Sequence, residues 1–166
     1  MDTFFEQITK IKLTGKTAFI IGLIITVDVL IILALMFFAL MFGLIELTPL
    51  ILIGAIYGGY KLVSLLSIEY EYIYTNGDLD VDKIVAKSNR KRVVSIKCSE
   101  VEKYGEYKGQ PAPGSVKATH VFCNPNSEGQ VYLIAKDRNQ GMVMIVLAPN
   151  DRIRAELEKA IPRLAK

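Results

Sequence analysis

Hydrophobic residues follow two patterns along the chain: long unbroken runs before about residue 68 and short alternating segments after it. The run at 18–42 has 25 residues with one charge, Asp28, and the run at 47–68 also has one charge, Lys61. About 20 apolar residues suffice for a helix to cross a bilayer, where the backbone must satisfy its own hydrogen bonds. The pattern therefore predicts two transmembrane helices, at 17–42 and 47–67, joined by a short external loop at 43–46.

The positions of lysine and arginine predict the topology of this hairpin. Lys10, Lys12 and Lys16 precede the first run, a basic segment at 83–92 follows the second, and the loop carries only Glu46. Because lysine and arginine accumulate on the cytoplasmic side, we expect both termini in the cytoplasm and a multi-pass protein of the cell (inner) membrane. A cleaved signal peptide is disfavoured, since its apolar region runs for only about 7–15 residues.

Residues 1–16 are expected to form a cytoplasmic segment before the first helix. Phe4, Phe5, Ile8 and Ile11 would lie near one face of a helix, which favours a short interfacial helix on the membrane surface. A frayed terminus is the alternative.

The two charges within the apolar runs need a structural reason, because a charge at the bilayer centre costs about 2.5–3.5 kcal/mol. If the hairpin folds about residue 45, Asp28 and Lys61 lie at nearly equal depth, which predicts an intramembrane ion pair. Gly54 and Gly58 share a helical stripe with Lys61 and form a small-residue face for helix packing. The alternatives are that Lys61 reaches the membrane surface and that Asp28 is protonated or meets a partner subunit.

From residue 68 onward the period of the pattern is two, which indicates strands. Asn76-Gly77 is a strong hairpin-turn signal between two of them. Further strands are expected at 92–104, 118–123, 130–136 and 142–148, and an amphipathic helix at 150–164 carries Ile153, Leu157, Ile161 and Leu164 on one stripe. The predicted fold class is a membrane α-helical hairpin followed by a mostly-β soluble domain, 68–166, built as a small barrel or sandwich capped by its C-terminal helix.

This layout resembles a pleckstrin-homology-like (PH-like) domain. The resemblance rests on the opening hairpin EYEYIYTNGDLDVDKI, the successive meander strands and the ending VMIVLAPNDRIRAELEKAIP. It implies seven strands, of which six are visible in the pattern. With the hydrophobic hairpin and the basic turn near residue 90, the whole chain is similar to a family of small uncharacterised bacterial membrane proteins. That resemblance implies no known activity.

Composition and charge narrow the range of functions. The formal net charge is only +3, and the soluble part holds 16 Lys and Arg against 13 Asp and Glu, so we expect no nucleic-acid binding. Two cysteines, Cys98 and Cys123, do not make a disulfide framework and are expected to be reduced thiols.

Candidate chemistry is sparse. His120 and Cys123 are three residues apart and would point to opposite faces of a strand, so neither a zinc site nor a cysteine nucleophile is favoured. Asp78, Asp80 and Asp82 alternate in a strand without the glycine and glutamate of a calcium-binding loop. We therefore expect no catalytic residues, no metal and no cofactor.

One cluster of cations, Arg90, Lys91 and Arg92, lies on a predicted turn soon after the second apolar run. Cations close to anionic headgroups gain about 1 kcal/mol each, so these residues are candidates for contact with anionic lipid. A solvated turn is the alternative. The long loop at 105–117 is a second candidate contact surface.

These observations predict a non-enzymatic, membrane-anchored binding or scaffold module at the cytoplasmic membrane face. Its expected partners are the lipid bilayer and a protein partner, or a second copy through the transmembrane helices. The alternative is an accessory subunit of a larger membrane complex. A less favoured alternative is an enzyme in which Cys98, His120 and an acid converge.

Overall fold

The structure, a computed structural model, describes residues 3–165. These residues form two compact units. Residues 12–67 make a helical unit, whereas 3–11 and 68–165 together make a β-rich unit.

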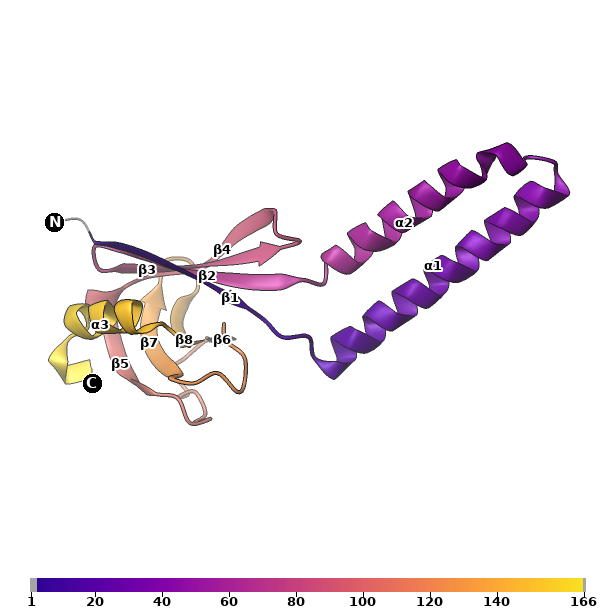
Figure 1. Ribbon diagram of the computed structural model, residues 1–166. Coiled ribbons are helices and arrows are strands. Elements are labelled where there is room, and N and C mark those ends of the chain that lie inside the picture. Colours follow the sequence, from indigo (N-terminus) through magenta and orange to yellow (C-terminus); the bar gives the residue numbers. More distant parts are fainter. Residues whose placement is uncertain (1–2, 166) are drawn as a thin grey trace. The chain divides into compact units, whose positions relative to one another are not determined.

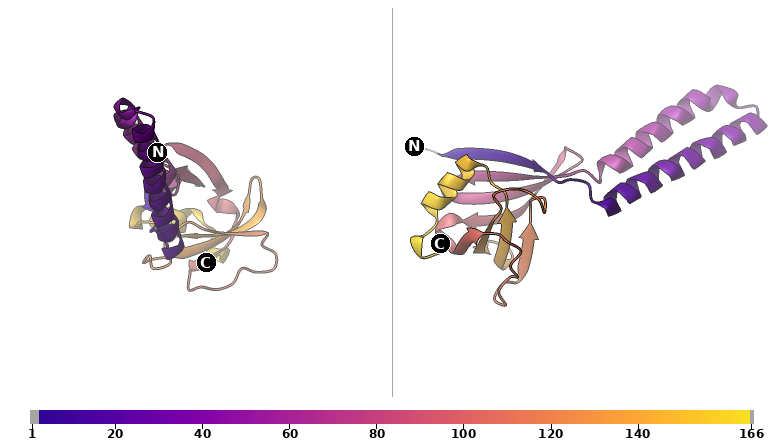
Figure 2. Two further views of the ribbon diagram at one scale, coloured as in Figure 1. Left: turned by 90° about the vertical axis from the view of Figure 1, so that its right-hand side faces the viewer. Right: turned by 60° about the horizontal axis from the view of Figure 1, so that its bottom comes forward.

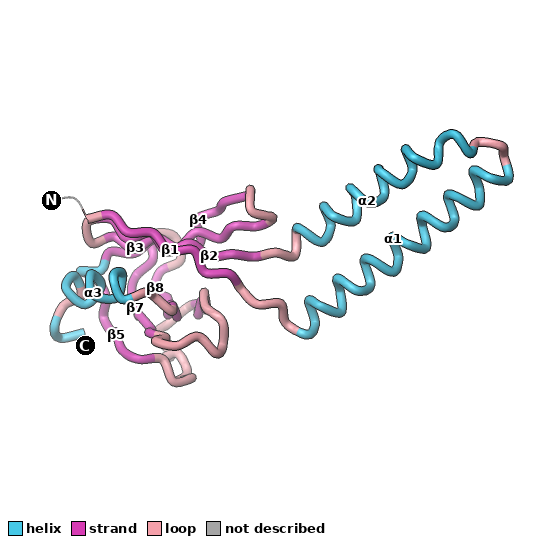
Figure 3. The backbone as a smooth tube through the Cα atoms, in the orientation of Figure 1, coloured by secondary structure: helices cyan, strands magenta, loops and turns pink. Residues whose placement is uncertain are grey.

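The helical unit is a hairpin of α1 (Gly15–Met41) and α2 (Thr48–Ser64), joined through the short 3₁₀ helix η1 (Ile45–Leu47). Figure 3 shows the two helices running antiparallel. Gly43, with a φ of +69°, ends α1 in the left-handed conformation that glycine adopts most readily. The Leu44 N–H donates to the Ala39 carbonyl oxygen at 2.8 Å, so the last turn of α1 closes as a Schellman motif.

Two helical segments, α1 and the continuous η1–α2 segment (Ile45–Ser64), are long and apolar enough to cross a membrane, and in each the most apolar 18-residue stretch is not buried within the chain. The core helix of a soluble protein would be mostly buried instead. The observed bounds differ by a few residues from the predicted 17–42 and 47–67, as is usual at helix ends.

The β-rich unit has two four-stranded sheets. The first contains β1 (Phe4–Lys10), β2 (Ile68–Thr75), β3 (Asp78–Val85) and β4 (Asn89–Lys97), antiparallel and in that order. Asn76 and Gly77, the predicted hairpin turn between β2 and β3, both have positive φ, 50° and 93°, as a type I′ turn requires. Because β1 precedes the helices and pairs with β2, both helices are inserted between neighbouring strands of one sheet.

The strand β1 corrects the expectation for residues 1–16, since neither a helix nor a frayed end describes 4–10. Phe5, Gln7 and Thr9 point inward and Phe4, Glu6 and Ile8 outward. The Gln7 amide nitrogen donates to the Ala148 carbonyl oxygen at 3.0 Å. Two inward polar residues hide the alternation of a strand, and Phe4 with Ile8 imitates a helical spacing.

The predicted long strand at 92–104 is two strands. The 3₁₀ helix η2 (Cys98–Glu100) turns the chain from β4 in the first sheet to β5 (Val101–Glu106) in the second. That split, together with β1, supplies the strands missing from the sequence pattern. The second sheet also contains β6 (Ala118–Val121), β7 (Val131–Asp137) and β8 (Gly141–Leu147), and its strand order is β5-β7-β8-β6. The edge strand β6 runs parallel to β8.

The core lies between the two sheets and α3 (Asp151–Ala160). Figures 1 and 2 show strands of the two sheets running in different directions, with α3 beside them. Ile153 and Leu157 of α3 are fully buried in this core. Asn150 caps α3, since its side-chain oxygen accepts from the Ile153 N–H at 2.9 Å. The helix ends before Pro162, and a 3₁₀ turn, η3 (Arg163–Ala165), follows.

The loop after β5 packs its side chains against the outer side of the second sheet. Tyr107, Ala112 and Val116 pack against a second cluster on the outer side of the second sheet, which includes Ile134 and Met144. The loop at 105–117 is therefore shaped by burial of its own side chains.

Candidate functional site

The two charges of the helical unit do not form an ion pair with each other in the described structure. Asp28 instead faces Gly59, and a Cβ atom added at Gly59 would lie 2.7 Å from the Asp28 carboxylate oxygen. The Lys61 ammonium lies over the Tyr57 ring, 5.7 Å from its centroid. The turn is centred one to two residues before residue 45, which brings residue 28 opposite residue 59 rather than residue 62.

Gly54 and Gly58 lie away from the contact between the two helices. A side chain added at either glycine would meet nothing within 4 Å. The glycine that admits close approach is Gly59, one residue beyond the predicted stripe. The surface of Gly54 and Gly58 is therefore open within the described chain.

The predicted cation cluster is divided between two faces, because residues 90–92 lie in β4 and not in a turn. The Arg90 guanidinium binds the buried Glu71 carboxylate at 2.7 Å. Arg92 binds Asp80 at 2.6 Å and Asp82 at 2.8 Å. Two of the three candidate lipid-contacting cations are thus paired with acids on the outer face of the first sheet.

Three lysines at the β3–β4 hairpin have no ion pair with any described residue: Lys83, Lys87 and Lys91. Lys83 and Lys91 are direct cross-strand partners. Like charges placed opposite each other destabilise a sheet, so this pair favours a bound anion. Lys87 is exposed in the turn between them and holds a positive φ of 57°.

These three lysines, which we call the hairpin lysines, belong to the end of the sheet where the chain passes to and from the helices. Ile68 pairs with Val85 and Val85 with Asn89, so the β3–β4 turn lies beside the start of β2. The Ile11 N–H donates to the Ile68 carbonyl oxygen at 3.2 Å as the last rung between β1 and β2. Only residues 11–14 and 65–67 separate this end of the sheet from α1 and α2.

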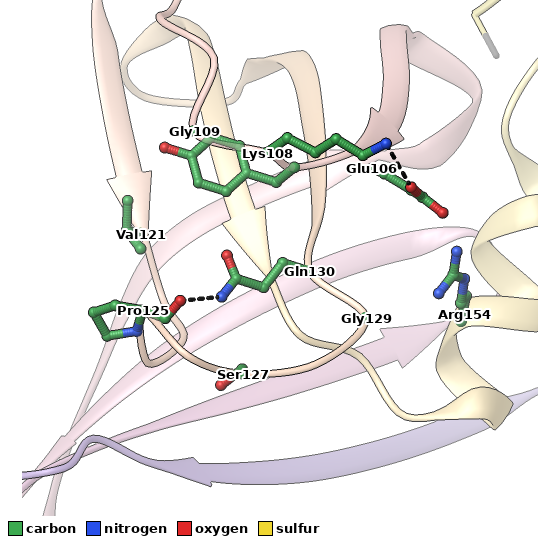
Figure 4. A pocket seen from close by; sticks show the side chains of 10 residues that line it. Glu106, Lys108, Gly109, Val121, Pro125, Ser127, Gly129, Gln130 and Arg154 are labelled. Atoms are coloured by element: carbon green, nitrogen blue, oxygen red, sulfur yellow. Dashed lines mark hydrogen bonds and ion pairs between the residues drawn. The ribbon is translucent and has the colours of Figure 1, made fainter.

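A cavity of about 670 Å³ opens at the end of the second sheet, between the loop after β5, the segment 125–130 and α3 (Figure 4). The Gln130 amide shapes one wall by donating to the Pro125 carbonyl oxygen at 2.8 Å. Lys108 pairs with Glu106 at 3.5 Å, and Arg154 pairs with Glu158 at 3.2 Å. Both cations of the wall are therefore neutralised by carboxylates, and their charges select no class of ligand.

Within the described residues, no hydrogen bond joins either thiol to His120. Burial raises the pKa of Cys98 to about 12 and also raises the pKa of Cys123, so both stay protonated at neutral pH. His120 stacks on Phe122 and its Nε2 lies 2.9 Å from the Gln140 side-chain oxygen. Within residues 3–165, no group of three or more His, Cys, Asp or Glu is arranged to hold a metal ion.

Sequence reasoning included Lys83 and Lys87 only within the basic segment at 83–92 that follows the second apolar run. It missed the acids that neutralise Arg90 and Arg92. The alternation of acids in 69–82 was visible, but the partners of each acid depend on the pairing of β3 with β4, which shifts register at Val81 and Asp82.

Comparison with known proteins adds one finding. A family model described as Bacterial PH-like domain (DUF6106) matches residues 1–166. No curated protein and no solved structure matches the chain.

Proposed function

Because this chain belongs to the bacterial PH-like domain family, we propose that it is a membrane-anchored binding module whose β-rich unit docks on anionic lipid headgroups through the hairpin lysines. In this proposal α1 and α2 span the cell membrane, and both termini face the cytoplasm. The observation that carries it is the direct opposition of Lys83 and Lys91 at the end of the sheet that continues into the apolar helices.

The anchoring is supported by the exposure of the apolar surfaces of both helices, which water would disfavour and lipid would accept. Tyr57, Tyr60 and Lys61 lie in the last two turns of α2, a position typical of residues at the cytoplasmic interface. The absence of lysine and arginine from the loop between the helices agrees with the same topology.

Docking on lipid is supported by charge and by tethering. Each hairpin lysine near an anionic surface would contribute about 1 kcal/mol. Two short linkers, 11–14 and 65–67, join the sheet to the helices, so helices that span the membrane would tether this end of the sheet by only a few residues. PH-like domains are typically binding modules, so no catalytic step is required of this chain.

The test uses the full chain in nanodiscs with and without phosphatidylglycerol. Ser88 is exposed, and both native cysteines are buried, so a Ser88→Cys variant takes a fluorophore selectively. Quenching of that fluorophore by spin-labelled lipid should increase when phosphatidylglycerol is present. Replacing Lys83, Lys87 and Lys91 with Gln should remove the increase.

The matched control removes three exposed lysines elsewhere in the β-rich unit: Lys103, Lys117 and Lys136. It changes the net charge by the same amount and should leave the quenching as in the parent. Equal quenching in the hairpin-lysine variant and its parent would reject lipid docking by these residues.

A second candidate function is that of an accessory subunit in a larger membrane complex. The open surface at Gly54 and Gly58 favours it, because small residues allow a helix of another chain to approach closely. This function and lipid docking use different surfaces.

A further inference from the structure

The strand β1 has an edge with free main-chain groups. It is the terminal strand of the first sheet. The rungs to β2 include the Thr3 carbonyl oxygen and the Ile11 N–H, so Phe4, Glu6 and Ile8 direct their N–H and C=O groups away from β2. No hydrogen bond to the main chain of these three residues is formed within the described part of the chain. Such an edge is a template for another strand.

The side chains along this edge are unusual for a solvated strand. Phe4 is 60% exposed and Ile8 is 51% exposed, and both lie on the outer face of the sheet with Glu6 between them. An edge protected against association usually carries lysine or proline, or is covered. Here Lys10 stands only at its far end, where the Asn124 amide also covers the Lys10 carbonyl oxygen.

One acid on the outer face of the first sheet, Glu6, has no basic partner among the described residues. Four other acids on this face each have a lysine or arginine within 4.0 Å: Glu69, Glu71, Asp80 and Asp82. Glu6 instead neighbours Glu71. Burial raises the pKa of Glu71 most, and the hydrogen bond and charge of Glu6 raise it further. A cation placed opposite Glu6 would relieve this repulsion between like charges.

The inner side of the edge adjoins a hollow of about 460 Å³ between β1 and α3. Phe5 forms its β1 wall, and Asp151, Arg152, Ala155 and Glu156 form its α3 wall. A strand added to β1 would alternate its side chains between this hollow and the outer face beside Phe4 and Ile8.

We propose that the edge of β1 binds an extended peptide segment of another protein by strand addition, and that this segment presents an apolar–basic–apolar alternation to Phe4, Glu6 and Ile8. Main-chain hydrogen bonds give the affinity, and the basic residue opposite Glu6 gives the selectivity. This surface is separate from the hairpin lysines, so the inference does not depend on lipid docking.

The probe is a short synthetic peptide alternating valine and threonine, with one valine on the valine face replaced by lysine. Full-length protein in nanodiscs of phosphatidylcholine is titrated with it. Hydrogen exchange at the Phe4, Glu6 and Ile8 amides should slow, because those donors become bonded. A peptide N-methylated along the pairing edge should give no protection.

Charge exchange tests the selectivity. Glu6→Lys should weaken binding of the lysine peptide roughly tenfold, since an attractive cross-strand pair becomes repulsive. A peptide with glutamate in place of lysine should recover the loss. Glu128→Lys, at an exposed loop position, is the matched control and should bind as the parent does.

Three results would overturn the inference. The N-methylated peptide could protect the same amides, which would exclude strand addition. The amides could already be protected without peptide in a concentration-dependent manner, which would assign the edge to a second copy of this chain. Protection could instead appear on adding phosphatidylglycerol alone, which would assign the edge to the membrane.

Discussion

The side-chain amide of Gln7 joins the strand that precedes the apolar helices to the segment that precedes α3. Its nitrogen donates to the Ala148 carbonyl oxygen at 3.0 Å, and its oxygen accepts from the Asn150 N–H at 2.7 Å. One side chain thus satisfies two main-chain groups that no strand pairing reaches. Because Asn150 also caps α3, β1 and α3 are held through a common residue.

We expect Gln7→Leu to lower the free energy of unfolding of the β-rich unit by about 1–3 kcal/mol, because it leaves a donor and an acceptor without partners. Guanidinium unfolding of the full chain in detergent, followed by near-ultraviolet circular dichroism, measures the change. Lys10→Gln is the control on the same strand and should change the stability by less than about 0.5 kcal/mol. Equal effects of both variants would show that the Gln7 bonds contribute nothing specific.

The raised pKa of Glu71 leads us to expect that the stability of the β-rich unit depends on pH. Burial, together with the hydrogen bond and the charge of Glu6, raises the pKa of Glu71 from 4.5 to about 7 despite the nearby Arg90. The folded state therefore holds this proton more tightly than the unfolded state does. The associated stability is fully present below about pH 4.5 and is lost as the pH rises through about 7.

We expect Glu71→Gln to remove this slope between about pH 4.5 and 7, because glutamine does not titrate there. Glu6→Gln should move the loss of stability to lower pH, since two causes of the raised pKa disappear with the carboxyl group. Unfolding midpoints across this pH range provide the measurement. An unchanged slope in Glu71→Gln would assign the pH dependence to other groups.

Gly58 and Gly59 offer a matched pair in the helical unit. A side chain at residue 59 would approach the Asp28 carboxylate oxygen to 2.7 Å and its carboxyl carbon to 3.2 Å, whereas one at residue 58 meets nothing within 4 Å. We expect Gly59→Leu to open the hairpin and slow its migration in detergent electrophoresis. Gly58→Leu should leave the migration unchanged.

Variants of Gly58 and Gly59 also test the accessory-subunit function independently of lipid docking. If Gly58→Leu reduces the oligomer size measured by light scattering in detergent while the hairpin stays intact, the accessory-subunit function gains support. An unchanged oligomer size would leave that function without its supporting surface.

Much of the fold could be predicted from local patterns. The apolar runs located both helices, Asn76-Gly77 located a hairpin, and the spacing of Ile153 and Leu157 located the C-terminal helix. The family match confirms the resemblance to a PH-like domain. These features depend on periodicity or on turn chemistry within a few residues, which a single sequence carries.

The remaining features depend on contacts between distant residues. β1 was missed because Gln7 and Thr9 face inward, and the main-chain partners of Gln7, at Ala148 and Asn150, lie far along the chain. The turn at 98–100 was missed because the apolar alternation of β4 leads into it without interruption. The pairing of Arg90 and Arg92 with acids could not be read from spacing, since it requires the strand register.

The two apolar helices lie between β1 and β2 in the sequence, and this order has a consequence for biosynthesis. As the chain is made, β1 leaves the ribosome before its neighbour β2, and all of residues 12–67 must follow before the two strands can meet. The first sheet can therefore close only after both hydrophobic helices have been produced. If those helices insert as proposed, β1 stays unpaired throughout their synthesis, and the sheet forms only after β2 has followed them.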